Sequence, residues 1–434
     1  MIRRIVKAVV PKQLFKQVMP AGHLVEAALY NAKNGFPTQG LKVIGVTGTN
    51  GKTTTVMMIH RMLHEAGYKV GMMSTVAYGV GADIKPQMKH MTTSSAPVVF
   101  GRMKAMRAKG IEWLVLEVTS HALHQNRVWG VPFSVAVVTN LTHEHLSYHG
   151  TFENYRKAKR KLFQMTDANM NGLRTGFVNA DDPEVAVFAT DISYPVMYGV
   201  DKGELRASNV KLSSDGVSYT ATHGDKTYQI KTQLPGSFNV YNSLAAVGVG
   251  EALGLSPEQI EKGIAALEGV EGRMNRIDEG QDFTVIVDYA HSPDSFDKLF
   301  ADLRPVVKGK LIAVFGSQGS TGDVAKRGIQ GKLAGQYADE VVLTEEDDRG
   351  EDGEGILKEI AGGAEAAGKV RDKDLFLVHD RTEAIEFAMG RAKAGDTVIL
   401  LGKGHEKTIQ RADVEEPWDE AGAARAALKK RSSR

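Results

Sequence analysis

A glycine-rich turn between an apolar strand and a helix, at residues 41–55, constrains this chain more than any other part of its sequence. The segment reads Leu-Lys-Val-Ile-Gly-Val-Thr-Gly-Thr-Asn-Gly-Lys-Thr-Thr-Thr. Its apolar residues Val43, Ile44 and Val46 predict a buried parallel strand, and Lys52 opens a helix predicted to run to about Ala66. Backbone N–H groups of such a turn, together with the helix N-terminus, form a concavity that binds anions.

The turn is a variant of the phosphate-binding loop. The usual pattern has a glycine at the position that Val46 occupies here. We expect Lys52 to reach the outer phosphates of a nucleoside triphosphate and the Thr53 hydroxyl to ligate Mg²⁺. The alternative is a glycine-rich turn without a ligand, but strand, turn, Lys-Thr pair and helix all occur in the required order. The residues predicted to contact ATP here are Gly48, Thr49, Asn50, Gly51, Lys52, Thr53 and Thr54.

Length, charge and cysteine content exclude several classes of protein. A chain of 434 residues has room for two or three domains. Its 54 Lys and Arg against 52 Asp and Glu are too balanced to indicate a nucleic acid as the main partner. It has no cysteine, hence neither disulfides nor thiolate metal sites, which fits a cytoplasmic location. The sequence contains no run of 18 apolar residues, so we predict no transmembrane helix.

The N-terminal segment is basic. Arg3, Arg4, Lys7, Lys12 and Lys16 precede the first acidic residue at position 26, and apolar residues lie between them. A secretory signal would need a longer uninterrupted apolar stretch. We predict a short helical extension over residues 1–40, which either packs on the next domain or lies as an amphipathic helix on an anionic membrane surface.

The order of elements after this extension predicts an α/β fold of two domains. Apolar strands and helices alternate over residues 41–271, which indicates a P-loop ATPase domain with a mostly parallel sheet. Residues 205–233 alternate polar and apolar side chains, as antiparallel hairpins do. A hinge at Gly272 introduces a smaller Rossmann-like α/β domain over residues 272–434, which is predicted to close over ATP. The last residues, 429–434, are predicted to be a frayed tail.

Polar side chains follow two of the predicted strands, where parallel sheets place their ligands. Glu117 ends the strand Trp113–Val118, and its carboxylate is placed to meet the Mg²⁺ of the phosphate-binding loop. The alternative interpretation is that Glu117 is a solvated residue at the end of a strand, without a metal. Three histidines, His143, His145 and His149, follow the strand Phe133–Thr139, but their spacing is not that of a zinc site.

Several blocks of sequence together resemble the Mur ligases, over about residues 41–410. The blocks are Val46-Thr-Gly-Thr-Asn-Gly-Lys-Thr-Thr-Thr55, Glu117-Val-Thr-Ser-His-Ala-Leu123, Thr139-Asn-Leu-Thr-His-Glu-His-Leu146, Tyr155-Arg-Lys-Ala-Lys-Arg-Lys-Leu-Phe163, Phe238-Asn-Val-Tyr-Asn242, Gly272-Arg-Met274, Val287-Asp-Tyr-Ala-His-Ser-Pro-Asp294 and Leu401-Gly-Lys-Gly-His-Glu406. Within the family, they are most similar to the branch that adds the third amino acid of the peptidoglycan stem peptide.

The resemblance implies an ATP-dependent amide ligase. ATP phosphorylates a substrate carboxylate, and an amine then displaces phosphate from the acyl phosphate. The implied substrates are UDP-MurNAc-L-Ala-D-Glu and meso-diaminopimelate or lysine. Two alternatives stay open: another amino-acid-adding ligase, similar to folylpolyglutamate synthase, and a non-catalytic P-loop scaffold subunit. A nucleic-acid-dependent ATPase is disfavoured by the balanced charge.

The resemblance also implies the metal site. Lys52 and Thr53 would hold ATP and a first Mg²⁺, with Glu117 and His145 completing that site. Lys159 matches a lysine that family members carry as a carbamate formed from CO₂, and a carbamate oxygen would hold a second Mg²⁺. Without the resemblance, the helix with Lys157, Lys159 and Lys161 would be interpreted as a solvated basic face.

The remaining implied residues bind nucleotide and substrates. For ATP they are Asn239, Asn242, Arg273 and Asp288, and for the carboxylate substrate they are Thr92, Thr93, Ser120 and Arg127. Arg349 matches the arginine of a motif in diaminopimelate-adding members, where it would clamp the distal carboxylate. Arg327 and Glu406 would help to hold the same amino acid.

The chain departs from the family pattern at several positions. Ser147 and Glu144 each stand where the family has Asp, the glycine-rich run 316–323 lacks its usual arginine, and Asp347-Asp348 replaces Asn-Pro. Forty residues leave no room for the N-terminal domain that grips the uridine nucleotide. We therefore expect either a carboxylate substrate recognised differently or a partner protein that supplies recognition.

Overall fold

The computed structural model describes residues 12–88, 91–213, 215–319, 324–412 and 414–432, without the side chains of residues 12–18 and 147. Residues 1–11 of the predicted extension and residues 320–323 of the glycine-rich run lie outside the described residues. The chain forms two compact units. Unit 1 comprises residues 1–211, 218–232 and 238–267, and unit 2 comprises residues 212–217, 233–237 and 268–434. No helix in the described ranges is long and apolar enough to cross a membrane.

The large sheet contains eleven strands among the described residues, in the order β11-β10-β9-β8-β7-β6-β1-β5-β2-β3-β4. Its strands are β1 (Lys42–Thr47), β2 (Val70–Met73), β3 (Ala77–Val80), β4 (Asp83–Pro86), β5 (Trp113–Glu117), β6 (Phe133–Val138), β7 (Thr175–Asn179), β8 (Tyr194–Gly199), β9 (Leu205–Ser213), β10 (Gly216–His223) and β11 (Lys226–Thr232). The run from β8 to β2 is parallel, whereas β3 pairs antiparallel with both β2 and β4.

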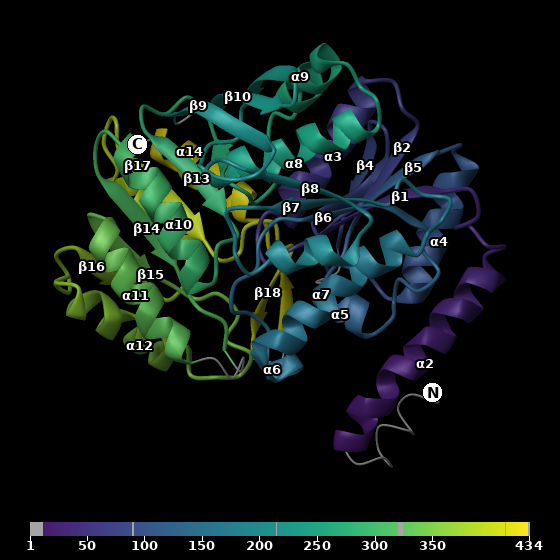
Figure 1. Cartoon of the computed structure of the whole chain (residues 1–434). Helices are drawn as coiled ribbons and strands as arrows, with labels where there is room; N and C mark the ends of the chain where they lie inside the picture. Colours follow the sequence, from purple (N-terminus) through teal and green to yellow (C-terminus); the bar gives the residue numbers. More distant parts are fainter. Residues whose placement is uncertain (1–11, 89–90, 214, 320–323, 413, 433–434) are drawn as a thin grey trace. The chain divides into compact units, whose positions relative to one another are not determined.

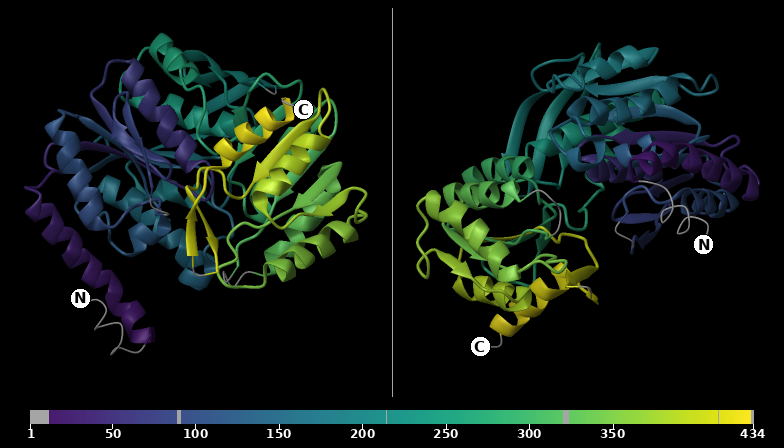
Figure 2. Two further views of the ribbon diagram at one scale, coloured as in Figure 1. Left: turned by 180° about the vertical axis from the view of Figure 1, so that it is seen from behind. Right: turned by 90° about the horizontal axis from the view of Figure 1, so that it is seen from below.

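Helices cover both faces of this sheet (Figures 1 and 2). They are α2 (Lys12–Lys33), α3 (Lys52–Glu65), α4 (Ala96–Ala108), α5 (Ser120–His124), α6 (Leu146–His149), α7 (Phe152–Asp167), the 3₁₀ helix η1 (Ala186–Asp191), α8 (Phe238–Ala252) and α9 (Pro257–Ala265). Helices α3, α8 and α9 pack together on one face, and α4, α5 and α7 lie on the other (Figure 1). Because β1 is covered on both faces, its side chains Val43, Ile44 and Val46 are all fully buried.

The described residues of unit 2 form a six-stranded sheet with the order β12-β13-β17-β14-β15-β16, parallel except at β12. Its strands are β12 (Asn275–Ile277), β13 (Thr284–Asp288), β14 (Leu311–Phe315), β15 (Glu340–Leu343), β16 (Leu375–Leu377) and β17 (Thr397–Leu401), with a separate hairpin of β18 (Thr408–Arg411) and β19 (Val414–Pro417). Its helices are α10 (Pro293–Leu303), η2 (Arg304–Val306), α11 (Ala325–Tyr337), α12 (Gly353–Ala366), α13 (Arg381–Arg391) and α14 (Glu420–Ser432).

The α/β class and the mostly parallel sheet confirm the predicted fold. The prediction of a frayed tail was wrong for residues 429–432, because α14 continues to Ser432 and buries Leu428, just before them, against the core of unit 2. Residues 433 and 434 lie outside the described residues. Lys429, Lys430 and Arg431 lie in the last turn of α14, where positive charges interact favourably with the negative end of the helix dipole.

Candidate active site

The phosphate-binding loop connects β1 to α3 and requires glycine at two positions. Gly48 has φ +145° and Gly51 has φ +81°, both in the region that disfavours L side chains. A Cβ atom would lie 1.9 Å from Thr139 Oγ1 at Gly48, and 2.3 Å from Asn242 Oδ1 at Gly51. The loop is therefore a close-fitting backbone cradle at the N-terminus of α3, as an anion site requires.

The residues that directly follow the neighbouring strand β6 hold this loop in place. Thr139 Oγ1 and Asn140 Nδ2 donate to the Asn50 carbonyl oxygen at 2.6 and 3.1 Å, and Asn140 Oδ1 accepts from Asn50 N at 2.9 Å. Thr49 Oγ1 lies 3.0 Å from the Tyr155 hydroxyl. The loop shape is thus fixed by residues about 90 positions away in sequence, which pre-organises its N–H groups.

Thr53 and Glu117 meet beneath the loop. Thr53 Oγ1 lies 3.0 and 3.1 Å from the two carboxylate oxygens of Glu117, and the backbone N of Thr75 donates to Glu117 Oε2 at 2.8 Å. Glu117 is only 1% exposed. The contact follows from topology, because β1 pairs in parallel with β5 and both strands end at the same edge.

Lys159 is a buried lysine on α7 that points at the same loop. It is 2% exposed, its Nζ donates to the Gly48 carbonyl oxygen, and it lies 4.8 Å from the centre of the Tyr155 ring. Burial, reinforced by the charge of Lys52, holds the pKa of Lys159 well below its usual value, while the Glu144 and Glu117 charges oppose that shift. A lysine in this setting tends to the neutral amine, so the interpretation of a solvated basic face is wrong for Lys159.

His145 stands at the start of α6 with φ +57°, and 45% of its side chain is exposed. Its ring lies edge-on to His121 at 4.8 Å, and its Nε2 lies 3.6 Å from Glu144 Oε2. Burial lowers the pKa of His121 to about 3, with His145 and His149 adding to the shift. Burial also lowers the pKa of His149 to about 4, so His121 and His149 present neutral nitrogen atoms near pH 7.

A second set of polar groups lies beside Glu117. Thr93 Oγ1 donates to the Glu117 carbonyl oxygen at 2.9 Å and accepts from Thr119 N at 2.9 Å. Arg127 Nη1 donates to the Thr93 carbonyl oxygen at 3.0 Å. Ser120 is buried at the start of α5, with its Oγ 3.0 Å from His149 Nε2. Thr92 is partly exposed just before Thr93.

Two asparagines on α8 lie behind the loop. Asn242 Oδ1 accepts from Thr55 Oγ1 at 3.3 Å, and Asn242 Nδ2 donates to Asn239 Oδ1 at 2.9 Å. Both side chains are buried. Of the remaining loop residues, Lys52 donates through Nζ to the Thr49 carbonyl oxygen at 2.6 Å, and Thr54 is buried in the first turn of α3.

In unit 2, Arg273 and Asp288 form one group with Tyr289. The Arg273 guanidinium lies 4.7 Å from the centre of the Tyr289 ring. Asp288 accepts from Met274 N and Ala290 N, each at 2.7 Å. Burial raises the pKa of Asp288, and the charge of Arg273 opposes the shift.

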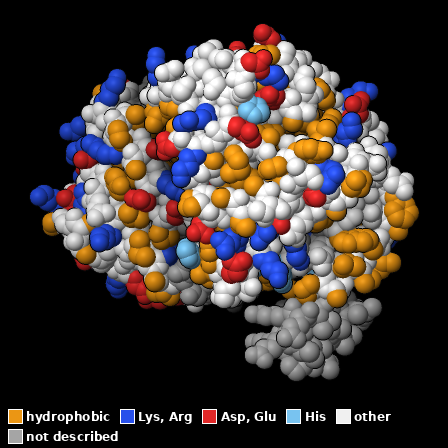
Figure 3. Space-filling view, viewed as in Figure 1, with side chains coloured by type: hydrophobic (Ala, Val, Ile, Leu, Met, Phe, Trp, Pro, Cys, Tyr) orange, Lys and Arg blue, Asp and Glu red, His pale blue; other side chains and the backbone are white. Residues whose placement is uncertain are grey.

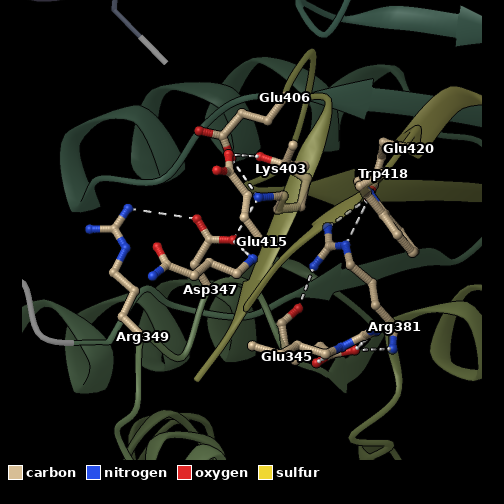
Figure 4. A network of polar contacts seen from close by, with 12 residues as sticks. Glu345, Asp347, Arg349, Arg381, Lys403, Glu406, Glu415, Trp418 and Glu420 are labelled. Carbon is tan, nitrogen blue, oxygen red and sulfur yellow. Dashed lines mark hydrogen bonds and ion pairs between the residues drawn. The ribbon is translucent and has the colours of Figure 1, made fainter. Parts of the chain in front are cut away.

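Two of the other predicted residues of unit 2, Arg349 and Glu406, lie in a network of charges around the buried side chains of Asp347 and Lys403 (Figure 4). Arg349 Nη2 lies 3.6 Å from Asp347 Oδ2, and Lys403 Nζ lies 2.8 Å from Asp347 Oδ1 and 2.7 Å from Glu406 Oε2. Arg327 is not in this network. Its guanidinium is 1% exposed and pairs with Glu351 and Glu359 at 2.6 and 2.8 Å.

Several residues that support the site were missed from the sequence. Asn140 and Thr139 brace the loop, Gln125 contacts Arg127, and Lys403 holds Asp347 and Glu406. Asn140, Thr139 and Lys403 stand inside blocks already noted in the sequence, so their motif positions were an available signal. No local pattern pointed to Gln125.

Comparison with known proteins extends these observations over nearly the whole chain. The pattern described as "Mur ligase middle domain" matches residues 46–250, and "Mur ligase, glutamate ligase domain" matches residues 272–404. The "UDP-N-acetylmuramyl-tripeptide synthetase" of Roseiflexus sp. (strain RS-1) is 41% identical, over 94% of this chain and 83% of that protein. The chain belongs to the Mur ligase family. As a member, it is an ATP-dependent, ADP-forming ligase that uses Mg²⁺.

Two further proteins support the same assignment. The "UDP-N-acetylmuramoyl-L-alanyl-D-glutamate--2,6-diaminopimelate ligase" of Geobacillus thermodenitrificans (strain NG80-2) is 39% identical to this Mur ligase, over 95% of this chain and 84% of that protein. A solved structure of a ligase with the same activity in its name has a TM-score of 0.65 and 29% identity, covering 96% of this chain and 83% of that chain.

The donor set fits Mg²⁺. Among the residues that the structure describes, no group of three or more His, Asp or Glu side chains could hold a metal by themselves. Mg²⁺ in nucleotide sites takes one or two carboxylates together with phosphate oxygens and waters. One buried carboxylate, Glu117, beside the Thr53 hydroxyl and the phosphate-binding loop, matches that requirement.

Proposed function

We propose that this Mur ligase joins an amino acid to the D-glutamyl residue of UDP-MurNAc-L-Ala-D-Glu in peptidoglycan precursor synthesis. The observation that carries the proposal is the gathering of Lys52, Thr53, Glu117 and Lys159 around one glycine-cradled loop. The names of relatives about 40% identical over most of the chain support the choice of substrates. Such precursors and ATP are found together in the cytoplasm, where we place the enzyme.

In this proposal the loop N–H groups and Lys52 bind the ATP phosphates. The other contacts to the nucleotide are made by Asn239, Asn242, Arg273 and Asp288. Thr53, Glu117 and His145 hold Mg²⁺, which when bound supplies charge stabilisation for the transferring phosphoryl group. The substrate carboxylate oxygen attacks the γ-phosphorus and ADP leaves. The amino group of the incoming amino acid then attacks the acyl carbon, and phosphate leaves with loss of a proton from the amine.

Lys159 is proposed to be carbamylated. A neutral lysine amine adds to CO₂ and releases one proton, which leaves an anionic carbamate. Burial favours the neutral amine that this step needs, and the carbamate carries oxygen atoms able to hold a second Mg²⁺. The carbamate would also place an anion close to the charge of Lys52.

For the carboxylate substrate we propose Thr92, Thr93, Ser120 and Arg127, which lie beside the Glu117 strand end. For the amino acid we propose Arg349 and Glu406, with Arg327 in a supporting place. Arg349 already faces the Asp347 carboxylate at 3.6 Å, so a distal substrate carboxylate would compete with Asp347 for this guanidinium. Meso-diaminopimelate offers such a carboxylate and lysine does not.

The first test is phosphate release from ATP with Mg²⁺, bicarbonate and UDP-MurNAc-L-Ala-D-Glu. Meso-diaminopimelate, lysine and no amino acid are compared, for wild type and Arg349→Lys. Release that needs both substrates and is fastest with diaminopimelate is expected, and R349K should reduce the diaminopimelate rate more than the lysine rate. Release that instead needs a folate and glutamate would support the ligase similar to folylpolyglutamate synthase. ATP binding without turnover on any acceptor would support a scaffold.

A second test addresses the carbamate. Intact mass of native protein should show an added CO₂ on Lys159, absent in Lys159→Gln. Removal of CO₂ and bicarbonate should slow the wild type, and returning bicarbonate should restore it. A rate that does not depend on CO₂ together with an unmodified Lys159 would contradict the carbamate while leaving the ligase assignment intact.

A further inference from the structure

The outward face of α2 carries an apolar stripe. Side chains along that face are exposed at Ala21, Val25, Leu29, Ala32 and Phe36, at spacings of three or four residues, with Phe36 just past the end of the helix. Val25, Leu29 and Phe36 are 55%, 63% and 47% exposed. An outward helix face in a globular protein is usually polar or charged. Figure 3 shows hydrophobic side chains gathered on this side of the molecule.

The opposite face of α2 is fixed on unit 1, so the apolar stripe cannot simply turn inward. His23, Ala27 and Asn31 are buried at successive helical turns, and Ala27 belongs to the core that contains α4. Asn126 Nδ2 donates to the Pro20 carbonyl oxygen at 3.0 Å, and Thr38 Oγ1 donates to Asn31 Oδ1 at 3.1 Å. The helix lies alongside α4 (Figure 2).

Positive charge lies at the Phe36 end of the stripe. A hollow of about 240 Å³ lies beside Phe36 and is lined on its other side by Lys104 and Arg107 of α4. Both cations are exposed, as is Lys33 at the end of α2. Helix α4 contains no acidic residue, and Glu26, the only acidic residue of α2, pairs with His23 at 3.1 Å. The chain before α2 adds Arg3, Arg4 and Lys7 in sequence, without an acidic residue.

We propose that this face, which we call the α2 face, docks on an anionic lipid surface. The stripe would enter the boundary between headgroups and acyl chains, and the cations of the hollow would meet lipid phosphates. A second copy of the chain is a poorer occupant. A twofold contact through the same face would bury Lys33, Lys104 and Arg107, whereas α2 and α4 offer one carboxylate, Glu26, which already pairs with His23.

The test is flotation of the full-length protein with vesicles of phosphatidylglycerol and phosphatidylcholine in equal parts, and with vesicles of phosphatidylcholine alone. Binding to the anionic vesicles is expected at low salt, with clear weakening at high salt because the cationic component is screened. Val25→Glu with Leu29→Glu should lower binding by more than about tenfold. Lys104→Gln with Arg107→Gln should lower it roughly fivefold per cation removed.

A matched control introduces two glutamates at exposed apolar residues outside the α2 face. Met170 and Val370 are 74% and 52% exposed, and neither lies on the α2 face. Met170→Glu with Val370→Glu should bind vesicles like the wild type. All variants should keep the wild-type melting temperature and ATP binding, which separates loss of docking from loss of folding.

Two outcomes would overturn the proposal. One is equal binding, or no binding, to both kinds of vesicle. The other is a dimer in sedimentation velocity that is lost in the V25E/L29E variant while no vesicle binds, which would assign the stripe to a second copy. Neither outcome bears on phosphate release, so the proposed ligase activity would stand or fall separately.

Discussion

Gln125 Oε1 accepts a hydrogen bond from Arg127 Nε at 2.8 Å. On its other side, Gln125 Nε2 donates to the Tyr148 hydroxyl at 2.8 Å, and that hydroxyl lies 3.0 Å from His124 Nδ1. Gln125 therefore connects the proposed carboxylate-binding arginine to α6, which begins directly after His145. The buried amide of Gln125 therefore fixes the orientation of the Arg127 guanidinium.

From this contact we predict the effect of Gln125→Leu. A hydrogen bond to a charged group contributes about 1.5–3 kcal/mol, so the KM for UDP-MurNAc-L-Ala-D-Glu should rise roughly tenfold or more. The KM for ATP should change little. Gln125→Glu keeps the acceptor for Arg127 and should restore most of the affinity. Steady-state phosphate release checks this, and equal losses for both substrates would show that Gln125 only supports folding.

Gly51 offers a second prediction, with a control in the same unit. Gly51→Ala introduces a Cβ 2.3 Å from Asn242 Oδ1 at φ +81°, whereas Gly254→Ala introduces one at φ +79° with no atom within 4 Å. Both should lose about 1–2 kcal/mol of stability from the left-handed backbone. Only G51A should also lose ATP binding, measured by calorimetry, because the loop must shift. Equal ATP affinity in the two variants would contradict the proposal that this loop is a close-fitting cradle for the ATP phosphates.

The Thr53–Glu117 contact predicts a change in metal dependence. Thr53→Val keeps the side-chain shape but removes the hydroxyl that lies 3.0 Å from Glu117 Oε2. The Mg²⁺ concentration for half-maximal phosphate release should rise about tenfold or more, since one proposed ligand and one hydrogen bond to a buried carboxylate are lost. A titration of Mg²⁺ at saturating ATP measures this. An unchanged Mg²⁺ dependence would exclude Thr53 from the metal site.

Much of the site follows from sequence because its parts end neighbouring parallel strands. The loop after β1 was predictable from glycine spacing, and the approach of Glu117 follows once β5 is placed beside β1. The burial of Lys159 could not be predicted, because Lys157 and Lys159 on one short stretch of helix are indistinguishable by composition, yet only Lys159 is buried. Contacts between residues far apart in sequence, such as Gln125–Tyr148, produce no periodic pattern from which they could be predicted. The antiparallel strands β3 and β4 at the edge of the sheet could not be predicted for the same reason.

His60 predicts how stability depends on pH. It is buried on α3, and its Nε2 has no hydrogen-bond partner in the part of the chain that the structure describes. Burial, with a smaller contribution from His64, lowers the pKa of His60 to about 4. The unfolded chain, with a pKa near 6.5, therefore takes up the proton first. Stability from the neutral ring is complete above pH 6.5 and is lost as the pH falls toward 4, by at most about 3 kcal/mol.

Other groups titrate in the same range, so the measurement compares wild type with His60→Leu. At pH 8 both carry a neutral side chain at this position, and any difference in their urea unfolding free energies reports packing and the hydrogen bond of His60 with the Val70 backbone. Between pH 6.5 and 4 the free energy of unfolding should fall faster for the wild type than for H60L. Only the wild type has a side chain at this position that binds a proton in the unfolded chain and stays neutral in the folded one. Parallel curves for the two proteins would mean that His60 is charged, or reaches water, in the folded state.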